Sequence, residues 1–324
     1  MRLIGLAVVL AVGLAFSPLA AEAQQAGKVP RVGVLYPGGS APLSLRMEAF
    51  RQGLRESGYV EGNTVAIESR YADGRGERLV KLAADLVQRE VSVIATSGDL
   101  ATRVVQQVTA TIPIVAFTDD LVGAGLVASH ARPGGNTTGI SILSPELNVK
   151  RLQLLKEVSP GISRVVVLWD PATGTAQLKV IEAAAGSLGV QLRVLEVRSP
   201  DALEDAFRLA QKERTQALNV LASPLLAAYS QRIVDLAAKG RLPAIYQWRE
   251  HAEAGGLVSY GPSLAAMWRQ SAIIVSKVLK GAKPADLPVE QPSKFELVVN
   301  LRTAKSLDLT ISPSVLLRAD EVIE

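Results

Sequence analysis

The sequence predicts an α/β fold of two similar lobes, each a doubly wound parallel sheet. The chain repeats itself: residues 31–37 (RVGVLYP) recur as 164–171 (RVVVLWDP), and 112–117 (IPIVAF) recur as 242–247 (LPAIYQ). Each half is too long to be a solenoid repeat. Apolar strands alternate with helical segments in both halves, the pattern of a parallel sheet covered by helices. We therefore expect function at the cleft between the two lobes.

In the first half, continuous apolar runs predict strands buried on both faces of a sheet. The run 32–36 ends at Pro37-Gly38-Gly39, a turn signal. The next segment has apolar residues at helical spacing and stops at Gly58, a favoured residue after a helix. The expected strands are 32–36, 64–71, 91–96 and 112–117, and the expected helices are 45–57, 77–89 and 100–109.

The second half repeats this order of elements. One helix stops at Gly189, as the first helix stops at a glycine. After the Pro-interrupted stretch 284–292, a last apolar segment predicts one more strand. The expected strands are 164–169, 191–197, 217–222, 243–246, 257–260 and 295–300, and the expected helices are 177–188, 201–213, 228–239 and 264–279.

The composition is that of a chain with large buried cores. The 324 residues are 48% hydrophobic and 20% charged, which excludes a largely disordered chain. The net charge of +4 is mildly basic, but lysines and arginines are interspersed with other residues along the chain. We therefore expect a mixed, solvated surface and no nucleic acid partner.

The N-terminus predicts a secretory signal peptide over residues 1–23. Arg2 gives a positive start, residues 3–16 are uncharged and apolar, and Ala21-Glu22-Ala23 places small residues where a signal peptidase reads. The alternative of a membrane anchor is disfavoured because the run falls short of the roughly 20 residues that span a bilayer. The chain has no cysteine, hence no disulfide and no lipid-modified cysteine. We expect a protein that is free in the periplasm.

Aromatic side chains gather at the predicted carboxyl ends of the strands, where ligands bind in such sheets. Aromatic residues make up only 4% of the chain. Any single one has the alternative role of covering the end of the sheet, but together they favour a cleft that stacks on its ligand. The aromatic residues at these ends are Tyr36, Phe117, Trp169, Tyr246, Trp248 and Tyr260.

Polar groups at the same strand ends are candidates for the charged parts of a ligand. Ser97-Gly98-Asp99 begins a helix, whose free N–H groups and positive dipole end suit a carboxylate, unless Ser97 or Asp99 is only an N-cap. An ammonium group calls for an acidic side chain, but each candidate aspartate has the alternative of capping a turn. The remaining candidates are Thr118, Asp119, Asp120, Asp170 and Ser223.

Signatures of catalysis are absent from the sequence. The chain has two histidines, His130 in a helical stretch and His251 among polar residues, and we expect both at the surface. There is no G-x-S-x-G, H-E-x-x-H or Walker lysine motif. The carboxylates are scattered and cysteine is missing, so no metal site and no cofactor are expected.

Many segments resemble the substrate-binding proteins of ABC importers, and more narrowly the family that includes tryptophan- and tyrosine-binding lipoproteins. They include RVGVLYPGGS, FRQGLRESGYVEG, LVASHARPGGNTTGIS, LLKEVSPGISRVVVLWDP and RIVDLAAKGRLPAIYQWREHAEAGGLVSYGP. The resemblance extends from about residue 32 to residue 324. It implies a type I periplasmic-binding fold that closes around a ligand. Several relatives carry an N-terminal lipidated cysteine, which this chain lacks.

The resemblance also implies where the lobes divide and what they contact. The hinge strands would lie near 138–142, 259–262 and 288–292. Residues 31–139 plus about 262–287 would form the N-terminal lobe, and residues 140–261 plus about 288–324 the C-terminal lobe. The expected partners are a small-molecule solute and an ABC permease, and the protein is expected to be monomeric.

The sequence thus predicts a periplasmic solute-binding receptor of an ABC importer, with an amino-acid-like or aromatic-compatible solute favoured and no enzymatic activity. The alternative is a periplasmic enzyme or a sensor input module on the same scaffold. A repressor of this fold would need a DNA-binding helix pair before the first strand, where the signal peptide stands.

Overall fold

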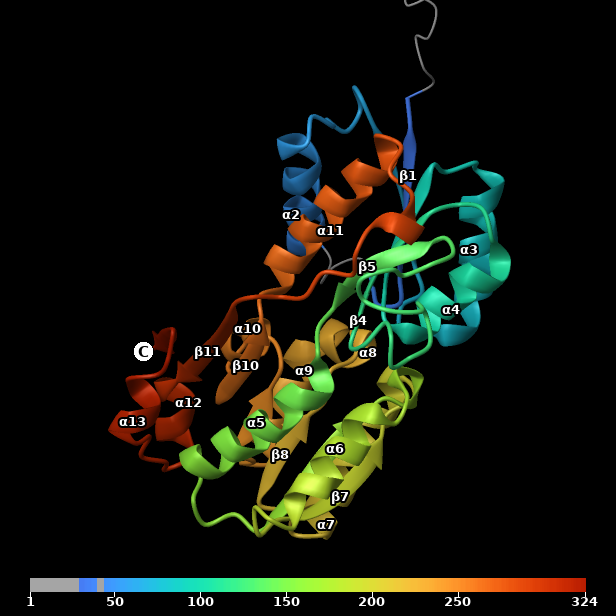
Figure 1. Ribbon diagram of the computed structural model, residues 1–324. Helices are drawn as coiled ribbons and strands as arrows, with labels where there is room; N and C mark the ends of the chain where they lie inside the picture. Colours follow the sequence, from blue (N-terminus) through green and yellow to red (C-terminus); the bar gives the residue numbers. More distant parts are fainter. Residues whose placement is uncertain (1–28, 40–43) are drawn as a thin grey trace, which may run out of the picture.

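The computed structural model describes residues 29–39 and 44–324, which form two α/β lobes (Figure 1). The predicted signal peptide, residues 1–23, lies outside the described residues. The first lobe is built on a five-stranded sheet and the second on a seven-stranded sheet. None of the helices in the described ranges is long and apolar enough to span a bilayer.

The sheet of the first lobe is entirely parallel, in the order β2-β1-β3-β4-β5. Its strands begin and end close to the predicted limits. The second strand starts two residues later than expected because a turn occupies the preceding residues, where the Gly62 N–H donates to the Val65 carbonyl at 2.9 Å. The strands are β1 (Arg31–Tyr36), β2 (Ala66–Tyr71), β3 (Val93–Ser97), β4 (Ile114–Thr118) and β5 (Thr137–Ser141).

Helices cover both faces of this sheet, as the continuous apolar strands require. Helices α2 and α11 lie side by side on one face, although most of the chain separates them in sequence (Figure 1). Helices α3 and α4 cover a second core on the other face. The helices are α2 (Ser44–Glu56), α3 (Leu79–Gln88), α4 (Asp99–Val108) and α11 (Leu264–Leu279).

The sheet of the second lobe has the order β12-β11-β10-β9-β8-β6-β7. It departs from the predicted all-parallel arrangement, because β11 runs antiparallel to β10. The chain enters β11 directly after its return from α11 on the first lobe, and so approaches the sheet from the opposite end. The strands are β6 (Arg164–Trp169), β7 (Gln191–Glu196), β8 (Ala217–Val220), β9 (Ala244–Tyr246), β10 (Val258–Pro262), β11 (Phe295–Asn300) and β12 (Glu321–Ile323).

Helices again form two cores, one on each face of this sheet. Helix α5, which follows directly on the crossover from the first lobe and packs against α6, was not predicted from the sequence. The helices are α5 (Ser144–Val158), α6 (Ala176–Ala185), α7 (Leu203–Lys212), α8 (Pro224–Ala228), α9 (Ser230–Lys239), α10 (Arg249–Glu253), α12 (Leu301–Ser306) and α13 (Pro313–Leu316). Short 3₁₀ turns are Gly76–Arg78, Pro171–Thr173, Pro200–Ala202 and Pro284–Asp286.

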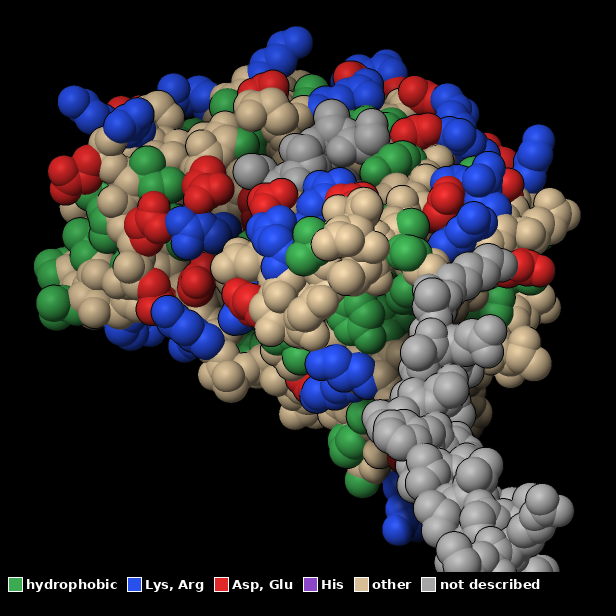
Figure 2. Space-filling model, turned by 90° about the horizontal axis from the view of Figure 1, so that it is seen from above, with side chains coloured by type: hydrophobic (Ala, Val, Ile, Leu, Met, Phe, Trp, Pro, Cys, Tyr) green, Lys and Arg blue, Asp and Glu red, His purple; other side chains and the backbone are tan. Residues whose placement is uncertain are grey.

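Three segments connect the lobes. After β5 the chain continues into α5, after β10 it continues into α11, and after α11 it returns to β11. The returning segment pairs with the first sheet at Glu290, which forms an isolated bridge with Ile140. The face of the first lobe seen in Figure 2 carries basic and acidic side chains interspersed, as the composition predicts.

The two lobes touch across the cleft between them. Three glycines of the first lobe face α8 of the second lobe so closely that an added Cβ would collide with it. At Gly38 the Cβ would lie 2.7 Å from Ala228 Cβ, and at Gly98 it would lie 2.8 Å from Pro224 Cγ. At Gly74 it would lie 2.8 Å from a Leu225 methyl group. The arrangement is therefore a closed one.

Candidate functional site

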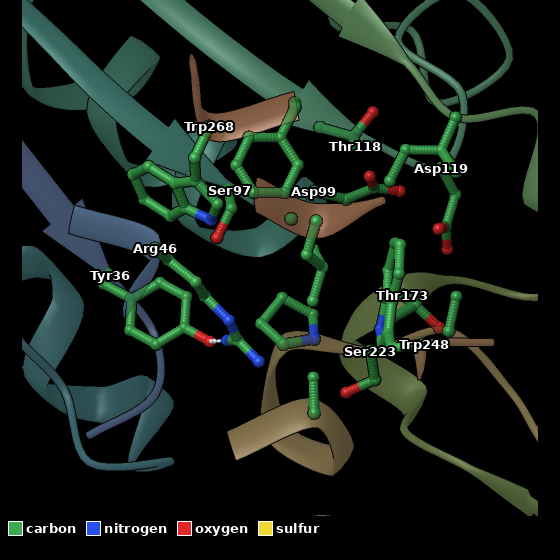
Figure 3. Close-up of a pocket in the computed structure, with 17 residues that line it drawn as sticks. Tyr36, Arg46, Ser97, Asp99, Thr118, Asp119, Thr173, Ser223, Trp248 and Trp268 are labelled. Carbon is green, nitrogen blue, oxygen red and sulfur yellow. Dashed lines mark hydrogen bonds between the residues drawn. The ribbon is translucent and has the colours of Figure 1, made fainter. Parts of the chain in front are cut away.

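A small cavity, about 40 Å³ in volume and partly open to solvent, lies between the lobes. Residues of both lobes surround it, and nine of the predicted site residues are among them (Figure 3). The lining residues are Tyr36, Arg46, Ser97, Gly98, Asp99, Phe117, Thr118, Asp119, Ile142, Thr173, Ala222, Ser223, Pro224, Ala227, Trp248, Leu264 and Trp268.

Aromatic rings form much of the wall. Tyr36 and Trp248 stand on opposite sides of the cavity and come from different lobes (Figure 3). Behind them, Trp268 on α11 makes edge-to-face contacts with Tyr36, Phe50 and Phe117 at centroid distances of 6.0, 5.9 and 5.1 Å. Offset and edge-to-face contacts of this kind are the favourable ones between rings. The wall is therefore a rigid aromatic surface.

Three predicted aromatic residues do not line this cavity. Trp169 packs in the second-lobe core and donates its indole N–H to the Gly174 carbonyl at 2.9 Å. Tyr246 stacks on His251 at 4.7 Å on the opposite face of that sheet. Tyr260 packs against Phe295. These side chains belong to the two faces of the sheet, because side chains alternate along a strand, and do not project beyond its end.

The loop before α4 contributes polar groups from the first lobe. Gly98 is the N-cap residue of α4, so the alternative in which Ser97 or Asp99 caps the helix is not the one found. Among the described residues, Ser97 Oγ and Trp268 Nε1 are buried atoms without a hydrogen-bond partner. Both point toward the cavity (Figure 3). A polar group of a ligand would satisfy them.

A basic side chain that the sequence analysis missed reaches into the same space. Arg46 on α2 is only 5% exposed and donates from Nη1 to the Tyr36 hydroxyl at 2.5 Å. Its guanidinium carries four further N–H groups, and it points into the cavity between Tyr36 and Ser223 (Figure 3). A buried guanidinium of this kind suits a carboxylate.

The three candidate aspartates occupy different environments. Asp170 accepts from Ala172 N–H at 2.9 Å and from the Ser223 hydroxyl at 2.7 Å, and Asp120 accepts from Val122 N–H at 3.1 Å. Both therefore cap turns. Asp119 lines the cavity and accepts a hydrogen bond from Gln177 of the second lobe.

Two carboxyl groups at the cavity have strongly raised pKa values. Burial raises the pKa of Asp99 to about 6, although Arg103 acts in the opposite direction. Burial, together with the negative charge of Asp99, raises the pKa of Asp119 to about 7. Each group is thus costly to ionise in the unliganded cavity, and a positive ligand group would relieve this cost.

This electrostatic arrangement predicts that Asp119→Asn stabilises the protein at high pH. The folded-state pKa lies above the ordinary value of 3.8 for an aspartate, so the stabilising contribution of Asp119 is complete below about pH 4 and is lost as the pH rises through about 7. Asparagine keeps an oxygen for Gln177 but carries no charge. We expect the melting temperature of the variant to exceed that of the wild type by about 5 °C at pH 8 and to equal it at pH 4.

Calorimetric scans of the two proteins at both pH values check this expectation. Asp235→Asn, which changes an exposed carboxylate on α9, is the matched control. An equal effect of Asp119→Asn at both pH values would contradict the assigned cause.

The prediction that both histidines are surface residues is wrong for His251. This side chain is 2% exposed, stacks on Tyr246, and has its pKa lowered by burial to about 3. It is therefore a neutral core residue. His130 is half-buried in a loop rather than in a helix. Among the described residues, no group of three or more His, Cys, Asp or Glu side chains is placed to hold a metal ion.

The residues that the sequence analysis missed come mainly from helices. Arg46 and Trp268 lie on α2 and α11, whose cavity-facing ends are fixed only when α11 packs on the first lobe. A weak signal for Trp268 did exist, since it is the sole tryptophan within a long apolar helix. Ile142, Thr173, Ala222, Pro224, Ala227 and Leu264 are also lining residues that were not predicted.

Two proteins similar to this chain carry descriptions that name an amino acid. The chain is 23% identical over 272 residues to a tyrosine-binding protein of Clostridioides difficile (strain R20291), covering 82% of this chain and 77% of that protein. A crystal structure of an ABC domain in complex with L-Trp from Streptococcus pneumoniae is 25% identical, with a TM-score of 0.84. It covers 91% of this chain and all of that one.

A conserved domain protein from Vibrio cholerae O1 biovar eltor str. N16961 gives a TM-score of 0.85 at 26% identity, covering 91% of this chain and 100% of that one. The predicted fold class is confirmed by these structures. The family model described as ABC transporter substrate binding protein matches residues 32–323. The chain therefore belongs to the ABC transporter substrate-binding protein family, as its segments predicted.

Proposed function

We propose that the protein captures an α-amino acid with an aromatic side chain in its interlobe cavity and presents it to an ABC permease. The observation that carries the proposal is the placement of opposite charges within an aromatic wall. Arg46 is suited to the carboxylate of the ligand, and the Asp99 and Asp119 carboxylates to its ammonium group. Tyr36 and Trp248 supply flat apolar surface for the side chain.

The relatives support this choice of ligand class. One is a tyrosine-binding protein and another was crystallised in complex with L-Trp, and both amino acids are zwitterions with an aromatic side chain. Members of the family bind small solutes, work with ABC permeases and act outside the cytoplasm. We infer further that the chain acts as a non-enzymatic monomer in the periplasm, without a nucleic acid partner, after removal of residues 1–23.

The cleft mechanism follows from the fold. We infer lobes of residues 31–139 plus about 262–287 and 140–261 plus about 288–324, which turn about the three connecting segments. Residues of both lobes line the cavity, so a ligand gains its full set of contacts only when the lobes close. A ligand that binds the closed form better shifts the population toward it, and the closed outer surface is what a permease would recognise.

Isothermal titration calorimetry with L-tryptophan, L-tyrosine and two analogues tests the proposal. Tryptamine lacks the carboxylate that Arg46 would bind, and indole-3-propionate lacks the ammonium group that the aspartates would bind. We expect at least one amino acid to bind with a Kd of about 1 μM or tighter, and both indole analogues to bind about 100-fold more weakly than L-tryptophan. Binding of neither amino acid, or binding of tryptamine as tight as that of L-tryptophan, would refute the proposed ligand class.

A further inference from the structure

The side-chain amide of Gln177 has a fixed orientation within the second lobe. Its Oε1 accepts from the Ala222 N–H at 3.0 Å and from Asn148 Nδ2 at 3.1 Å. Its Nε2 donates to the Ala222 carbonyl at 2.8 Å. A flipped amide would set donor against donor and acceptor against acceptor at Ala222, so the orientation is set by groups of the second lobe alone.

The second N–H of Gln177 crosses to the first lobe. It donates to Oδ2 of Asp119, which follows β4 and lines the cavity. The Asp119 carbonyl accepts from the Leu143 N–H at 2.8 Å, within the crossover that leads into α5. Gln177 is 1% exposed, so this hydrogen bond is shielded from water. A shielded hydrogen bond to a charged group is stronger than one between neutral groups.

A buried polar chain supports Gln177 from behind. Asn148 accepts a hydrogen bond from Arg151, and Arg151 Nε donates to the Tyr260 carbonyl in β10 at 3.0 Å. The chain therefore runs from β10, which leads into the second crossover, through Asn148 to Gln177. The positive charge of the fully buried Arg151 also favours the ionised form of Asp119, against the larger effect of burial.

We propose that Gln177 is a latch for closure, pre-oriented in the second lobe, that binds Asp119 of the first lobe and holds the cleft shut. The inference deepens the proposed function and rests on it for the role of the cavity as the ligand site. One carboxylate serves both partners, because Asp119 faces the cavity and the latch at once. An ammonium group in the cavity keeps Asp119 ionised, and an ionised Asp119 is the better acceptor for Gln177.

The cysteine-free chain allows the latch to be tested by spin labelling. Labels on Lys81→Cys in α3 and Lys212→Cys in α7, both exposed, report the distance between the lobes by double electron–electron resonance. Distances are measured without ligand and with saturating L-tryptophan. At pH 8, where Asp119 is largely ionised, we expect Gln177→Met to lower the ratio of closed to open protein about tenfold, as the loss of one hydrogen bond to a charged group predicts.

A second variant tests whether the effect of Gln177→Met on the interlobe distances comes merely from altering a buried side chain. Asp119→Ala removes the latch from the first-lobe side and leaves the bonds at Ala222 intact, so it should shift the ligand-free distances as Gln177→Met does. The double variant should shift them no further. Asn300→Leu is the matched control, because Asn300 is buried and donates to the Ala252 carbonyl inside the second lobe. It should leave the distances unchanged.

The latch is refuted if Gln177→Met matches the wild type in both conditions, or if the effects of the two single variants add. Stopped-flow binding of L-tryptophan gives an independent readout: the dissociation rate should rise about tenfold in Gln177→Met and the association rate should stay constant, since a latch acts after encounter. If neither L-tryptophan nor L-tyrosine binds the wild type, the proposed ligand class is wrong, and the ligand-free distances alone decide on the latch.

Discussion

Replacing Arg46 with Met is expected to weaken the binding of L-tryptophan about 100-fold, with little change in the enthalpy of unfolding. Arg46 is a buried cation whose guanidinium points into the cavity, and removing it leaves a ligand carboxylate desolvated without a partner. Loss of one member of a buried charged pair typically costs about 2–5 kcal/mol. Methionine keeps most of the side-chain volume, so the aromatic wall should remain packed. Titration calorimetry measures the affinity.

Two further variants show whether charge or position matters. Arg46→Lys retains the charge but not the planar fork of donors, and we expect a loss of about tenfold. Arg55→Met removes an exposed arginine from the same helix, where it pairs with Glu48 at 2.7 Å, and should leave the affinity unchanged. Equal affinities for Arg46→Met and the wild type would mean that the ligand carboxylate lies elsewhere. Tryptamine binding should be insensitive to Arg46→Met.

Replacing Gly38 with Ala is expected to weaken binding by about 30-fold, mainly by destabilising the closed state. The new methyl group would lie 2.7 Å from Ala228 Cβ, an atom that cannot rotate away, and 2.6 Å from Cε1 of the Tyr36 ring, which must turn aside. Overpacking of this size costs about 1–3 kcal/mol. Because Ala228 belongs to the second lobe, the collision with it arises only when the lobes meet, whereas Tyr36 lies in the same lobe as Gly38. Small-angle scattering with saturating L-tryptophan should show a larger radius of gyration for the variant than for the wild type.

Compensation at the facing residue provides the stringent control. Gly38→Ala combined with Ala228→Gly removes the collision with the second lobe and should recover part of the affinity, since the close approach to Tyr36 Cε1 remains. Gly161→Ala introduces the same methyl group where nothing lies within 4 Å, and should be neutral. If Gly38→Ala binds as tightly as the wild type, the contact between Gly38 and α8 does not form part of the liganded state.

The sequence was sufficient to predict the architecture because both lobes repeat one pattern of buried strands and helices. The predicted helix 264–279 coincides with α11, because its apolar spacing is regular and Ser263 caps it. The antiparallel β11 was not predictable in the same way. Its direction depends on the path of the chain from the first lobe back to the second, and the local apolar pattern carries no information on strand direction.

The candidate site was predictable only for residues in the loops that follow the strands, because these loops lie at the cleft. Ser97, Gly98 and Asp119 follow their strands in loops, so their position at the strand end places them at the cavity. Trp169 and Tyr246 are the last residues of their strands. Because side chains alternate between the two faces of a sheet, Trp169 and Tyr246 point into the two cores of the second lobe and not into the cavity. The apolar pattern of a strand does not show to which face of the sheet its last side chain points.

The return of the chain to the first lobe sets the order in which the two lobes can complete their folding. Trp268 on α11 contacts three aromatic rings of the first lobe, and α11 covers the same sheet face as α2. A nascent chain that ends before α11 would therefore expose this apolar face to solvent. The first lobe, although begun earliest, cannot complete its core until most of the polypeptide has been synthesised, and premature termination should yield aggregation rather than a functional half-molecule.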